Sequence, residues 1–460
     1  MFLKIYNTLS KKKEIFKPLK DKKVGIYTCG PTVYWYQHIG NLRSYIFPDI
    51  LKKVLKVQGY KVKHVINVTD VGHLTSNADE GEDKIEKAAK KEGKNAKEIS
   101  EFYFRIFRED LKKINVSEPD FWPKATQHIN EQIELIKKLE KKGFTYKTSD
   151  GIYFDTSKIK DYGKLAGLNI EGLKAGKRIS LGEKKNKTDF ALWKFSKKRG
   201  VRQQEWDSPW GVGFPGWHIE CSAMSMKYLG ESFDIHTGGE DHIPVHHTNE
   251  IAQSEGATGK PFVKYWLHGA FLTSGGEKIS KSKGGFYTLS EIEEKGYNPL
   301  DLKYFYLSAH YRKPLEFKFQ ALDAARNSLN RLKEIISRLD KGKRVNKKNV
   351  ELAYKQFLEF LNDDLNFPKA LSYMWDILRE ERLNDTEKYE LVLKFDEIFG
   401  LDLGKEKKIE IPEEVLNLAT EREKLRLKKK FKEADMIRQK INNLGFIIED
   451  NKKGFILKKK

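Results

Sequence analysis

The sequence predicts an α/β protein with a parallel sheet, an insertion within the sheet, and helical and basic regions after it. Short apolar strands alternate with amphipathic helices in the first third of the chain, and this alternation resumes near residue 217. Leu and Ile then recur at helical spacing over residues 311–402. Alternating strands and helices are typical of parallel sheets, and 460 residues suffice for two or more domains with buried cores.

The first third begins with a βαβ unit. Residues 24–28 alternate as a short strand that ends at a Gly-Pro pair, and an amphipathic segment covers residues 38–58. Pro48 interrupts that segment, so we expect a kink or a break there. Residues 62–68 form the next strand, and strand, helix and strand in this order favour a parallel sheet. Charged helical patterns follow over about residues 82–115.

Residues 116–194 have a different pattern, which is typical of an insertion of mixed structure. Two short apolar runs flank Ser149, Asp150 and Gly151, a strong hairpin signal. The α/β pattern then resumes with a helix from Trp217, a strand at residues 233–236, a helix from His246 and a strand near residues 263–267.

The last part of the chain is predicted to be helical and then basic. Residues 311–402 predict a bundle of successive amphipathic helices. The last 40 residues carry 14 Lys and Arg against 6 Asp and Glu, and they predict two helices and a hairpin around Asp450 and Asn451.

Composition restricts the class of protein. Lys and Arg total 87 against 66 Asp and Glu, so the net charge is +21 and a polyanionic partner is expected, although solvated Lys-rich faces would explain the same balance. Two cysteines 192 positions apart cannot form a disulfide framework, which indicates a reducing compartment. No apolar stretch resembles a signal peptide or approaches the ~18 residues of a membrane span. We therefore expect a soluble, cytoplasmic protein with no membrane partner.

The two cysteines lie in motifs that suit a metal ion. His246 and Glu250 are four residues apart, so on a helix they share one face. Two thiolates, an imidazole and a carboxylate make a plausible zinc set: Cys29, Cys221, His246 and Glu250. His242 and His247 are competing ligands, and two buried cysteines beside a helix-capping His-Glu pair would explain the same residues. Structural zinc sites have closely spaced cysteine pairs, which this chain lacks, so the metal is expected to face a pocket.

Two further motifs suit phosphate binding. The string His38-Ile39-Gly40-Asn41 begins a helix, whose N-terminus directs unpaired N–H groups at an anion, although a core histidine would also fit so short a string. The string Lys278-Ile279-Ser280-Lys281-Ser282 lies between two Gly-Gly pairs and offers two lysines as a clamp for polyphosphate. A solvated loop could have a similar sequence by chance. The string follows the helix with the candidate metal ligands and a strand, and this order favours the phosphate-binding interpretation.

Together these motifs resemble the signatures of the class I aminoacyl-tRNA synthetases, which have the forms His-Ile-Gly-His and Lys-Met-Ser-Lys-Ser. Within that class the chain is similar to the cysteinyl-tRNA synthetase family from about residue 2 to its C-terminus. The strings that carry this similarity are residues 27–34 (YTCGPTVY), 121–125 (FWPKA), 216–224 (GWHIECSAM) and 249–254 (NEIAQS).

The resemblance implies a domain order. It implies a Rossmann-like catalytic domain in two halves (residues 1–115 and 195–260), a connective insertion (116–194), a stem-contact region with the KISKS loop (261–310), a helical bundle (311–402) and a basic anticodon-binding domain (403–460). The bundle would contact the inner corner of the L-shaped tRNA.

The resemblance also implies roles for individual residues. Zinc would be bound by Cys29, Cys221, His246 and Glu250, and it would in turn bind the substrate thiolate. Four protein ligands usually complete the coordination of zinc, so the substrate must add a further ligand. The amino-acid pocket would be lined by Thr32, Thr69, Trp217 and Asp241. ATP would contact His38, Gly40, Asn41, Lys278 and Lys281. His38, Asn41 and the two lysines would be catalytic, the lysines by stabilising charge that develops on the phosphates.

The chain departs from the family signatures at two positions. Asn41 replaces the second histidine, and Ile279 replaces methionine. Asparagine keeps a hydrogen-bonding head group and isoleucine keeps an apolar anchor, so we expect activity to be retained. In the terminal domain the resemblance implies anticodon contacts by Arg426, Phe431 and Asp435, where the Phe431 ring either stacks on a base or packs in the core.

The implied activity is the ATP-dependent ligation of L-cysteine to its tRNA through a cysteinyl-adenylate, with magnesium accompanying ATP, by a monomer. One alternative is a cysteine ligase of mycothiol-type biosynthesis, which lacks the basic terminal module. Another is a non-catalytic, zinc-containing RNA-binding paralogue, which intact His38, Lys278 and Lys281 disfavour. The insertion is too short for a separate hydrolytic site, so rejection of serine is expected at the metal.

Overall fold

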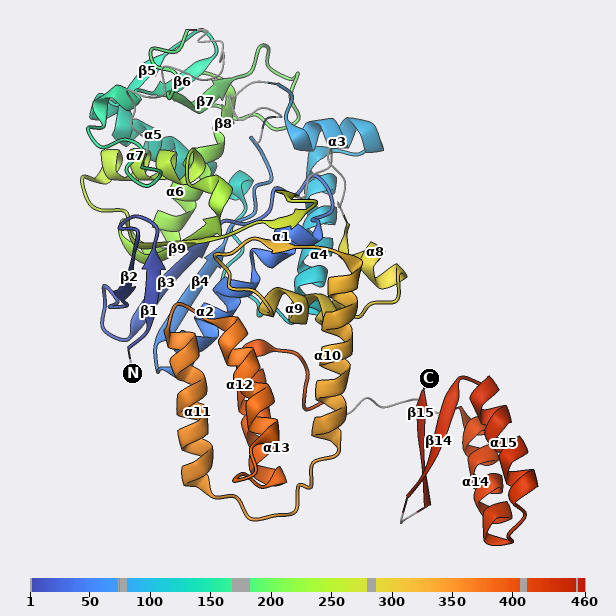
Figure 1. Ribbon diagram of the computed structural model, residues 1–460. Coiled ribbons are helices and arrows are strands. Elements are labelled where there is room, and N and C mark those ends of the chain that lie inside the picture. The colour runs from blue at the N-terminus through green and yellow to red at the C-terminus, as the bar shows by residue number, and fades with distance from the viewer. Residues whose placement is uncertain are drawn as a thin grey trace. The chain divides into compact units, whose positions relative to one another are not determined.

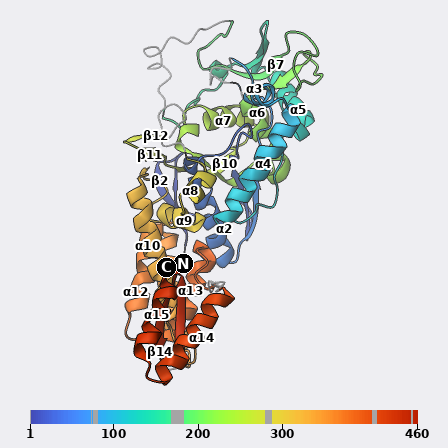
Figure 2. The same ribbon diagram turned by 90° about the vertical axis from the view of Figure 1, so that its right-hand side faces the viewer.

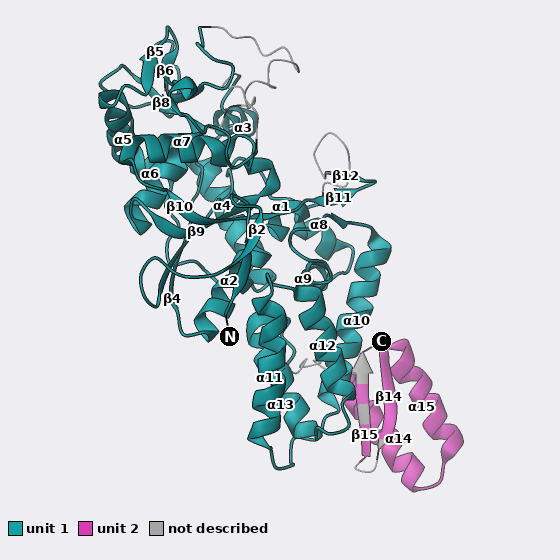
Figure 3. Cartoon of the chain, turned by 60° about the vertical axis from the view of Figure 1, so that its left-hand side comes forward, with its two compact units in different colours: residues 1–403 teal, residues 404–460 magenta. Residues whose placement is uncertain are grey.

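The computed structural model describes residues 2–72, 74, 81–167, 183–278, 287–405, 412–451 and 454–459. The chain divides into two compact units, residues 1–403 and 404–460 (Figure 3). Within the described ranges, no helix combines the length and the apolar character needed to cross a bilayer.

A four-stranded parallel sheet forms the centre of unit 1 (Figure 1). Its strands are β3 (Lys23–Thr28), β4 (Lys61–Ile66), β9 (Phe233–Gly239) and β10 (Val263–Gly269), in the spatial order β10-β9-β3-β4. All neighbouring pairs are parallel. The predicted α/β class is therefore confirmed, and the pairing of β3 with β9 joins two parts of the chain that are far apart in sequence.

The helical segment after β3 is in two pieces. Helix α1 (Ile39–Arg43) and helix α2 (Ile46–Val57) are separated at Ser44 and Tyr45. The prediction of a kink or break at Pro48 is wrong, because Pro48 is the third residue of α2. The first N–H groups of a helix have no partner within it, so proline is tolerated there without the loss of a hydrogen bond.

Two helices follow β4, namely α3 (Lys84–Glu92) and α4 (Ala96–Lys113). Gly93 ends α3 with a φ of +63°, which suits glycine, and Asn95 caps α4. After them come the short helix η1 (Ala125–His128) and α5 (Ile129–Lys141).

The next segment forms an antiparallel sheet of β5 (Thr145–Lys147), β6 (Gly151–Phe154), β7 (Phe190–Phe195) and β8 (Gly213–Pro215), with η2 (Thr156–Lys158) between β6 and β7. The predicted hairpin is β5-β6. Because β7 pairs with β8, this sheet extends past residue 194. Helix α6 (Trp217–Leu229), η4 (Glu240–His242) and helix α7 (His246–Thr258) then accompany β9.

A small sheet follows β10. Strand β11 (Leu272–Ser274) pairs antiparallel with β12 (Glu277–Lys278) and parallel with β13 (Leu315–Glu316), and α8 (Leu289–Glu294) and α9 (Pro299–Leu307) lie between β12 and β13 in sequence. The chain begins with a hairpin of β1 (Lys4–Asn7) and β2 (Lys12–Ile15), which the sequence did not predict.

The bundle consists of α10 (Phe319–Ser337), α11 (Lys347–Asn362), α12 (Phe367–Arg379) and α13 (Asp385–Phe399). The rings of Phe357 and Phe395 stack at 4.0 Å between α11 and α13. Both ribbon views place these helices at the end of unit 1 opposite the β5–β8 sheet (Figures 1 and 2).

Unit 2 contains α14 (Glu413–Leu427), α15 (Phe431–Asn443) and the antiparallel hairpin of β14 (Phe446–Asn451) and β15 (Gly454–Lys459). These are the two helices and terminal hairpin that the sequence predicts. The buried Arg422 donates two hydrogen bonds to the Asp450 carboxylate, at 2.6 and 2.9 Å, and so ties α14 to β14.

Candidate active site and metal centre

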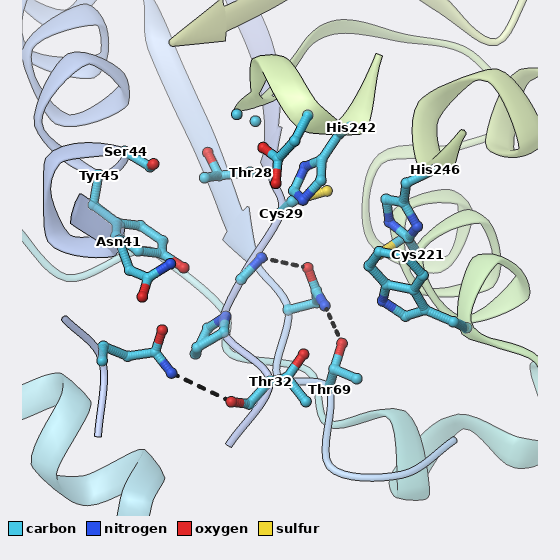
Figure 4. A pocket seen from close by; sticks show the side chains of 18 of the residues that line it. Thr28, Cys29, Thr32, Asn41, Ser44, Tyr45, Thr69, Cys221, His242 and His246 are labelled. Atoms are coloured by element: carbon cyan, nitrogen blue, oxygen red, sulfur yellow. Dashed lines mark hydrogen bonds between the residues drawn. The ribbon is translucent and has the colours of Figure 1, made fainter. Parts of the chain in front are cut away.

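A cavity of about 710 Å³ opens beyond the carboxyl ends of β3 and β9. Ligands of open parallel sheets bind at such edges, where loops from neighbouring strands meet. Nine of the residues predicted from sequence line this cavity: Cys29, Thr32, His38, Asn41, Thr69, Trp217, Cys221, Asp241 and His246. Figure 4 shows Cys221 and His246 on one side of the cavity, Asn41 and Tyr45 on the opposite side, and Cys29 between them.

The predicted metal ligands form one buried group. One ligand atom from each of Cys29, Cys221, His246 and Glu250 lies within 4.8 Å of every other. His246 and Glu250 share a face of α7, with Nε2 of the histidine 3.0 Å from Oε1 of the carboxylate. Cys29 follows β3, and Cys221 lies on α6 beside α7, so the sheet and two helices bring together residues that are distant in sequence.

Electrostatics in this group favour anionic ligands. Burial raises the pKa of the Cys29 thiol. A hydrogen bond from the Cys29 thiol, together with the nearby His246, lowers the pKa of Cys221 to about 6. Burial opposes a charged Glu250, but His236 and His246 outweigh it and lower the pKa of Glu250 to about 2. Burial also opposes a charged His246, yet Glu250 and Cys221 raise its pKa to about 10. One thiolate and one carboxylate are thus available at neutral pH to a divalent cation.

A second layer of imidazoles surrounds the ligands. His236 Nε2 lies 2.9 Å from the second oxygen of Glu250, and His247 Nε2 lies 3.1 Å from the Cys29 sulfur. His247 Nδ1 in turn lies 2.7 Å from His268 Nε2. Atoms of Cys29, His236, His247 and Glu250 also fall within 4.8 Å of one another, so this second set is geometrically able to hold an ion. Such partners orient metal ligands.

The sequence reasoning named His247 but missed His236 and His268. Both lie inside apolar strands, where a single histidine looks like a core residue. Their signal was the unusual presence of histidine in two neighbouring buried strands. His242 lines the cavity but belongs to neither group of potential ligands found among the described residues.

The residues predicted to hold the amino acid line the same cavity as three of the candidate metal ligands. The Trp217 ring stacks on His246 with a centroid distance of 4.3 Å. Thr32 and Thr69 face each other across a parallel backbone bridge. Asn67 donates to Thr69 Oγ1 at 3.2 Å and accepts from the Gly30 amide at 2.8 Å. Asp241 lies on η4 at the exposed rim.

Glycine is required at position 30, because a Cβ there would lie only 1.6 Å from the Asn67 carbonyl oxygen. The string Cys-Gly-Pro-Thr therefore brings the β3 loop against the β4 loop, and this close approach places Cys29 and Thr32 in one cavity.

The His38–Asn41 string at the start of α1 is held by its own hydrogen bonds. The Asn41 amide donates to His38 Nδ1 at 3.2 Å, and the His38 amide donates to Asn41 Oδ1 at 3.3 Å. This reciprocal capping gives Asn41 a structural task that a histidine would not perform in the same way. A Cβ on Gly40 would lie 2.8 Å from the His38 ring. Lys281 and Ile279 lie outside the described residues, as does the side chain of Lys278.

The predicted anticodon residues lie in unit 2. The Phe431 side chain is 55% exposed at the start of α15, so it does not pack in the core. Asp435 is also exposed, one turn further along the helix. Arg426 lies at the end of α14, 3.5 Å from the Asp450 carboxylate.

The chain matches known proteins along its whole length. The family described as "tRNA synthetases class I (C) catalytic domain" matches residues 15–327. "Cysteine--tRNA ligase 1" of Burkholderia lata is 49% identical over 457 residues, which cover 99% of this chain and 96% of that protein. "Cysteine--tRNA ligase" of Thermococcus gammatolerans is 43% identical over 487 residues, covering 100% and 99%.

A solved structure shares the fold. The methionyl-tRNA synthetase of Mycobacterium tuberculosis, in complex with methionyl-adenylate, superposes with a TM-score of 0.57 over 82% of this chain and 90% of that one. Its sequence identity is 14%, so this likeness concerns the fold alone. The family match and the full-length relatives decide the assignment: the chain belongs to the cysteinyl-tRNA synthetases, a family of class I aminoacyl-tRNA synthetases.

Proposed function

We propose that the protein joins L-cysteine to its cognate tRNA in two steps. The cysteine carboxylate attacks the α-phosphorus of ATP, which gives cysteinyl-adenylate and releases pyrophosphate. A hydroxyl of the 3′-terminal adenosine then attacks the acyl carbon, which gives cysteinyl-tRNA and releases AMP. The names of the full-length relatives support the overall reaction.

The juxtaposition of two chemistries in one cavity carries this proposal. Cys221 and His246 line one side, with Cys29 next to them in the middle of the cavity, and a thiol would be recognised there. Asn41 lines the opposite side, where phosphates would lie, and His38, which is hydrogen-bonded to Asn41, also lines the cavity. A substrate that has a thiol at one end and reacts with ATP at the other fits both sides at once.

The donor set supports zinc as the resident metal. Two sulfurs, an imidazole and a carboxylate are the ligand types that zinc prefers, and all four are buried within reach of one ion. A zinc ion held there would accept a substrate thiolate far more readily than a hydroxyl. Trp217 covers His246, while His236 and His247 fix the orientations of Glu250 and Cys29.

The other pocket residues are assigned by their chemistry. The Asp241 carboxylate suits the α-ammonium group, and Thr32 and Thr69 offer hydroxyls within the cavity. His38 and Asn41 would contact ATP with Gly40 allowing close approach, and Lys278 and Lys281 would stabilise the charge that develops on the α-phosphate and pyrophosphate. Magnesium would accompany ATP as its counter-ion.

The tRNA is expected to contact several regions. Unit 2, in which Phe431 is exposed, would bind the anticodon with Arg426 and Asp435. The bundle of residues 311–402 would contact the inner corner of the tRNA, and residues 261–310 the stem.

The test is an assay of both steps with zinc-loaded protein. We expect cysteine-dependent exchange of pyrophosphate into ATP, and charging of a transcript of the cysteine tRNA. Exchange without charging, combined with amide formation on an amino sugar, would instead indicate a biosynthetic cysteine ligase. The absence of both activities would contradict the proposal.

A further inference from the structure

Arg43, the last residue of α1, is 6% exposed and donates to four backbone carbonyls. Its Nη1 donates to Ala270 at 2.9 Å and to Phe271 at 2.5 Å, and its Nη2 donates to Lys313 at 2.7 Å and to His310 at 3.4 Å. Burial lowers the pKa of Arg43 to about 10, so the guanidinium remains charged at neutral pH. A buried charge is costly unless hydrogen bonds satisfy it, and removing the guanidinium would leave these four carbonyls without that donor.

The four carbonyls belong to the base of one small sheet. Ala270 and Phe271 immediately precede β11, and residues 310–313 precede β13. Strand β11 pairs with both β13 and β12. The Lys-Ile-Ser-Lys-Ser motif begins at Lys278, the last residue of β12, and continues in sequence to Ser282. Arg43 therefore bonds α1 to the segment that leads into this motif.

The segment that leaves the motif is bonded to the same helix. The Ile39 amide donates to the Tyr287 carbonyl at 2.8 Å, and His38 forms an antiparallel bridge with Thr288. Tyr306 Oη donates to the Ile39 carbonyl at 2.6 Å, which also holds α9 to α1. The helix that carries the first signature motif, α1, is thus hydrogen-bonded to the segments on both sides of the second.

The backbone of Phe271 is hydrogen-bonded to a second element as well. Its carbonyl accepts from Arg43, and its amide donates to Glu240 Oε1 at 3.0 Å. Glu240 belongs to η4 and directly precedes Asp241 at the cavity rim. Phe271 is consequently the point where α1, η4 and the base of the lysine-bearing hairpin meet.

We propose that Arg43 is a positioning residue for adenylate formation: it sets the distance between the His-Ile-Gly-Asn helix and the β11–β12 hairpin, which ends at Lys278 and precedes Lys281 in sequence. Arg43 is not among the cavity-lining residues, so it acts through the groups it places. The inference rests on the proposed function, since it assumes that both motifs act on the same ATP.

The first variant is Arg43→Lys, which keeps the charge but cannot reproduce the planar fork that reaches four carbonyls. Displacement of catalytic groups by ~1 Å costs roughly 10²-fold in rate, so we expect kcat of ATP–pyrophosphate exchange to fall by about that factor. KM for cysteine should stay within about twofold, because interactions made mainly in the transition state affect kcat.

A double-mutant cycle separates positioning from general structural damage. In a Lys281→Ala background there is no lysine left at that position to place, so Arg43→Lys should cost only about two- to threefold. The matched control is Arg312→Lys. Arg312 lies in the same 310–313 segment but binds Asp364, at 2.8 Å from Nε, and should leave exchange unchanged.

A second variant covers the case in which Arg43→Lys folds poorly. Glu240→Gln weakens the hydrogen bond to the Phe271 amide while Arg43 stays buried and bonded. Its effect on kcat of exchange should also be smaller in the Lys281→Ala background than in the wild type, with a smaller loss overall than for Arg43→Lys. Equal losses in both backgrounds, or wild-type exchange in Arg43→Lys, would overturn the inference. A wild-type enzyme without cysteine-dependent exchange would instead overturn the proposed function, so the two failures are distinguishable.

Discussion

Two cysteines that are far apart in sequence meet because β3 ends where α6 passes. Cys29 lies in the loop after β3, and Cys221 lies on α6, which packs against α7 with its His246–Glu250 pair. These residue types could be predicted as a metal set from sequence, since thiols are scarce in this chain and both lie in motif-rich strings.

Cys221→Ser should remove most of the zinc from the protein. A hydroxyl is a poor zinc ligand, and the low pKa of the Cys221 thiol marks it as the thiolate of the group. Elemental analysis should give about one zinc per wild-type chain and clearly less in the variant. Ser225→Ala, also buried on α6, is the matched control and should retain the metal. Unchanged zinc in Cys221→Ser would remove this residue from the ligand set.

Other residues of the site were not predictable from their sequence context. His236 lies in a buried strand, and its contact with Glu250 depends on how β9 packs under α7. Arg43 looks like an ordinary helix-terminal arginine until Ala270 and Phe271 are placed beside it. These roles arise from contacts between residues that are far apart in sequence, and the local sequence pattern gives no information about such contacts.

At the scale of elements, local signals predicted structure well where they were strong. The hairpin around Asp150 and the helices starting at Trp217 and His246 formed as expected. The break in the first helical segment was misplaced because Pro48 was assumed to lie in a helix interior. The β1–β2 hairpin was missed because its turn has no glycine, and Lys11 adopts a φ of +59° there.

The exposed ring at the start of α15 makes a specific prediction about tRNA. Phe431→Ala should lower kcat/KM for tRNA charging by roughly 10- to 100-fold, because stacking on a base is worth ~1–3 kcal/mol. Phe431→Tyr keeps the ring and should retain charging. Leu444→Ala, also exposed at the other end of α15, is the control. Charging that responds equally to Phe431→Ala and Leu444→Ala would rule out a stacking role.

A buried lysine joins three elements of unit 1. Lys303 on α9 is fully buried and donates to the Asn115 carbonyl at 2.8 Å, and it lies against Gly400 at the end of α13. Burial and Lys53 lower the pKa of Lys303 from 10.5 to about 7, against the opposing effect of Asp49.

This lysine predicts how stability depends on pH. Between about pH 7 and pH 10 the unfolded chain binds a proton at Lys303 that the folded chain lacks, so its contribution to the free energy of unfolding rises with pH, by up to ~1.4 kcal/mol per unit. Urea unfolding of wild type and Lys303→Met should show this slope in the wild type and a flatter one in the variant. Lys56→Met, at an exposed site on α2, should keep the wild-type slope. Parallel slopes in wild type and Lys303→Met would show that Lys303 stays protonated in the fold.

For the whole molecule, we expect the group formed by Cys29, Cys221, His246 and Glu250 to choose the amino acid through a bound metal ion. Cysteine and serine differ by a sulfur and an oxygen, and apolar contacts separate such near-isosteres by only ~10²-fold. Cys29, Cys221 and His246 of this group line the cavity together with Trp217, so selection would occur before ATP is spent. The segment of residues 116–194 contributes α5, which packs against α6 and α7, and strands β5–β7, of which β7 packs against α6.

The most direct test compares serine with cysteine in the first step. ATP–pyrophosphate exchange should be at least ~10⁴-fold less efficient with serine, as kcat/KM, and tRNA should cause no serine-dependent release of AMP. Efficient activation of serine, followed by continuous AMP release without charged tRNA, would show that discrimination occurs by proofreading and would contradict the role assigned to the metal group.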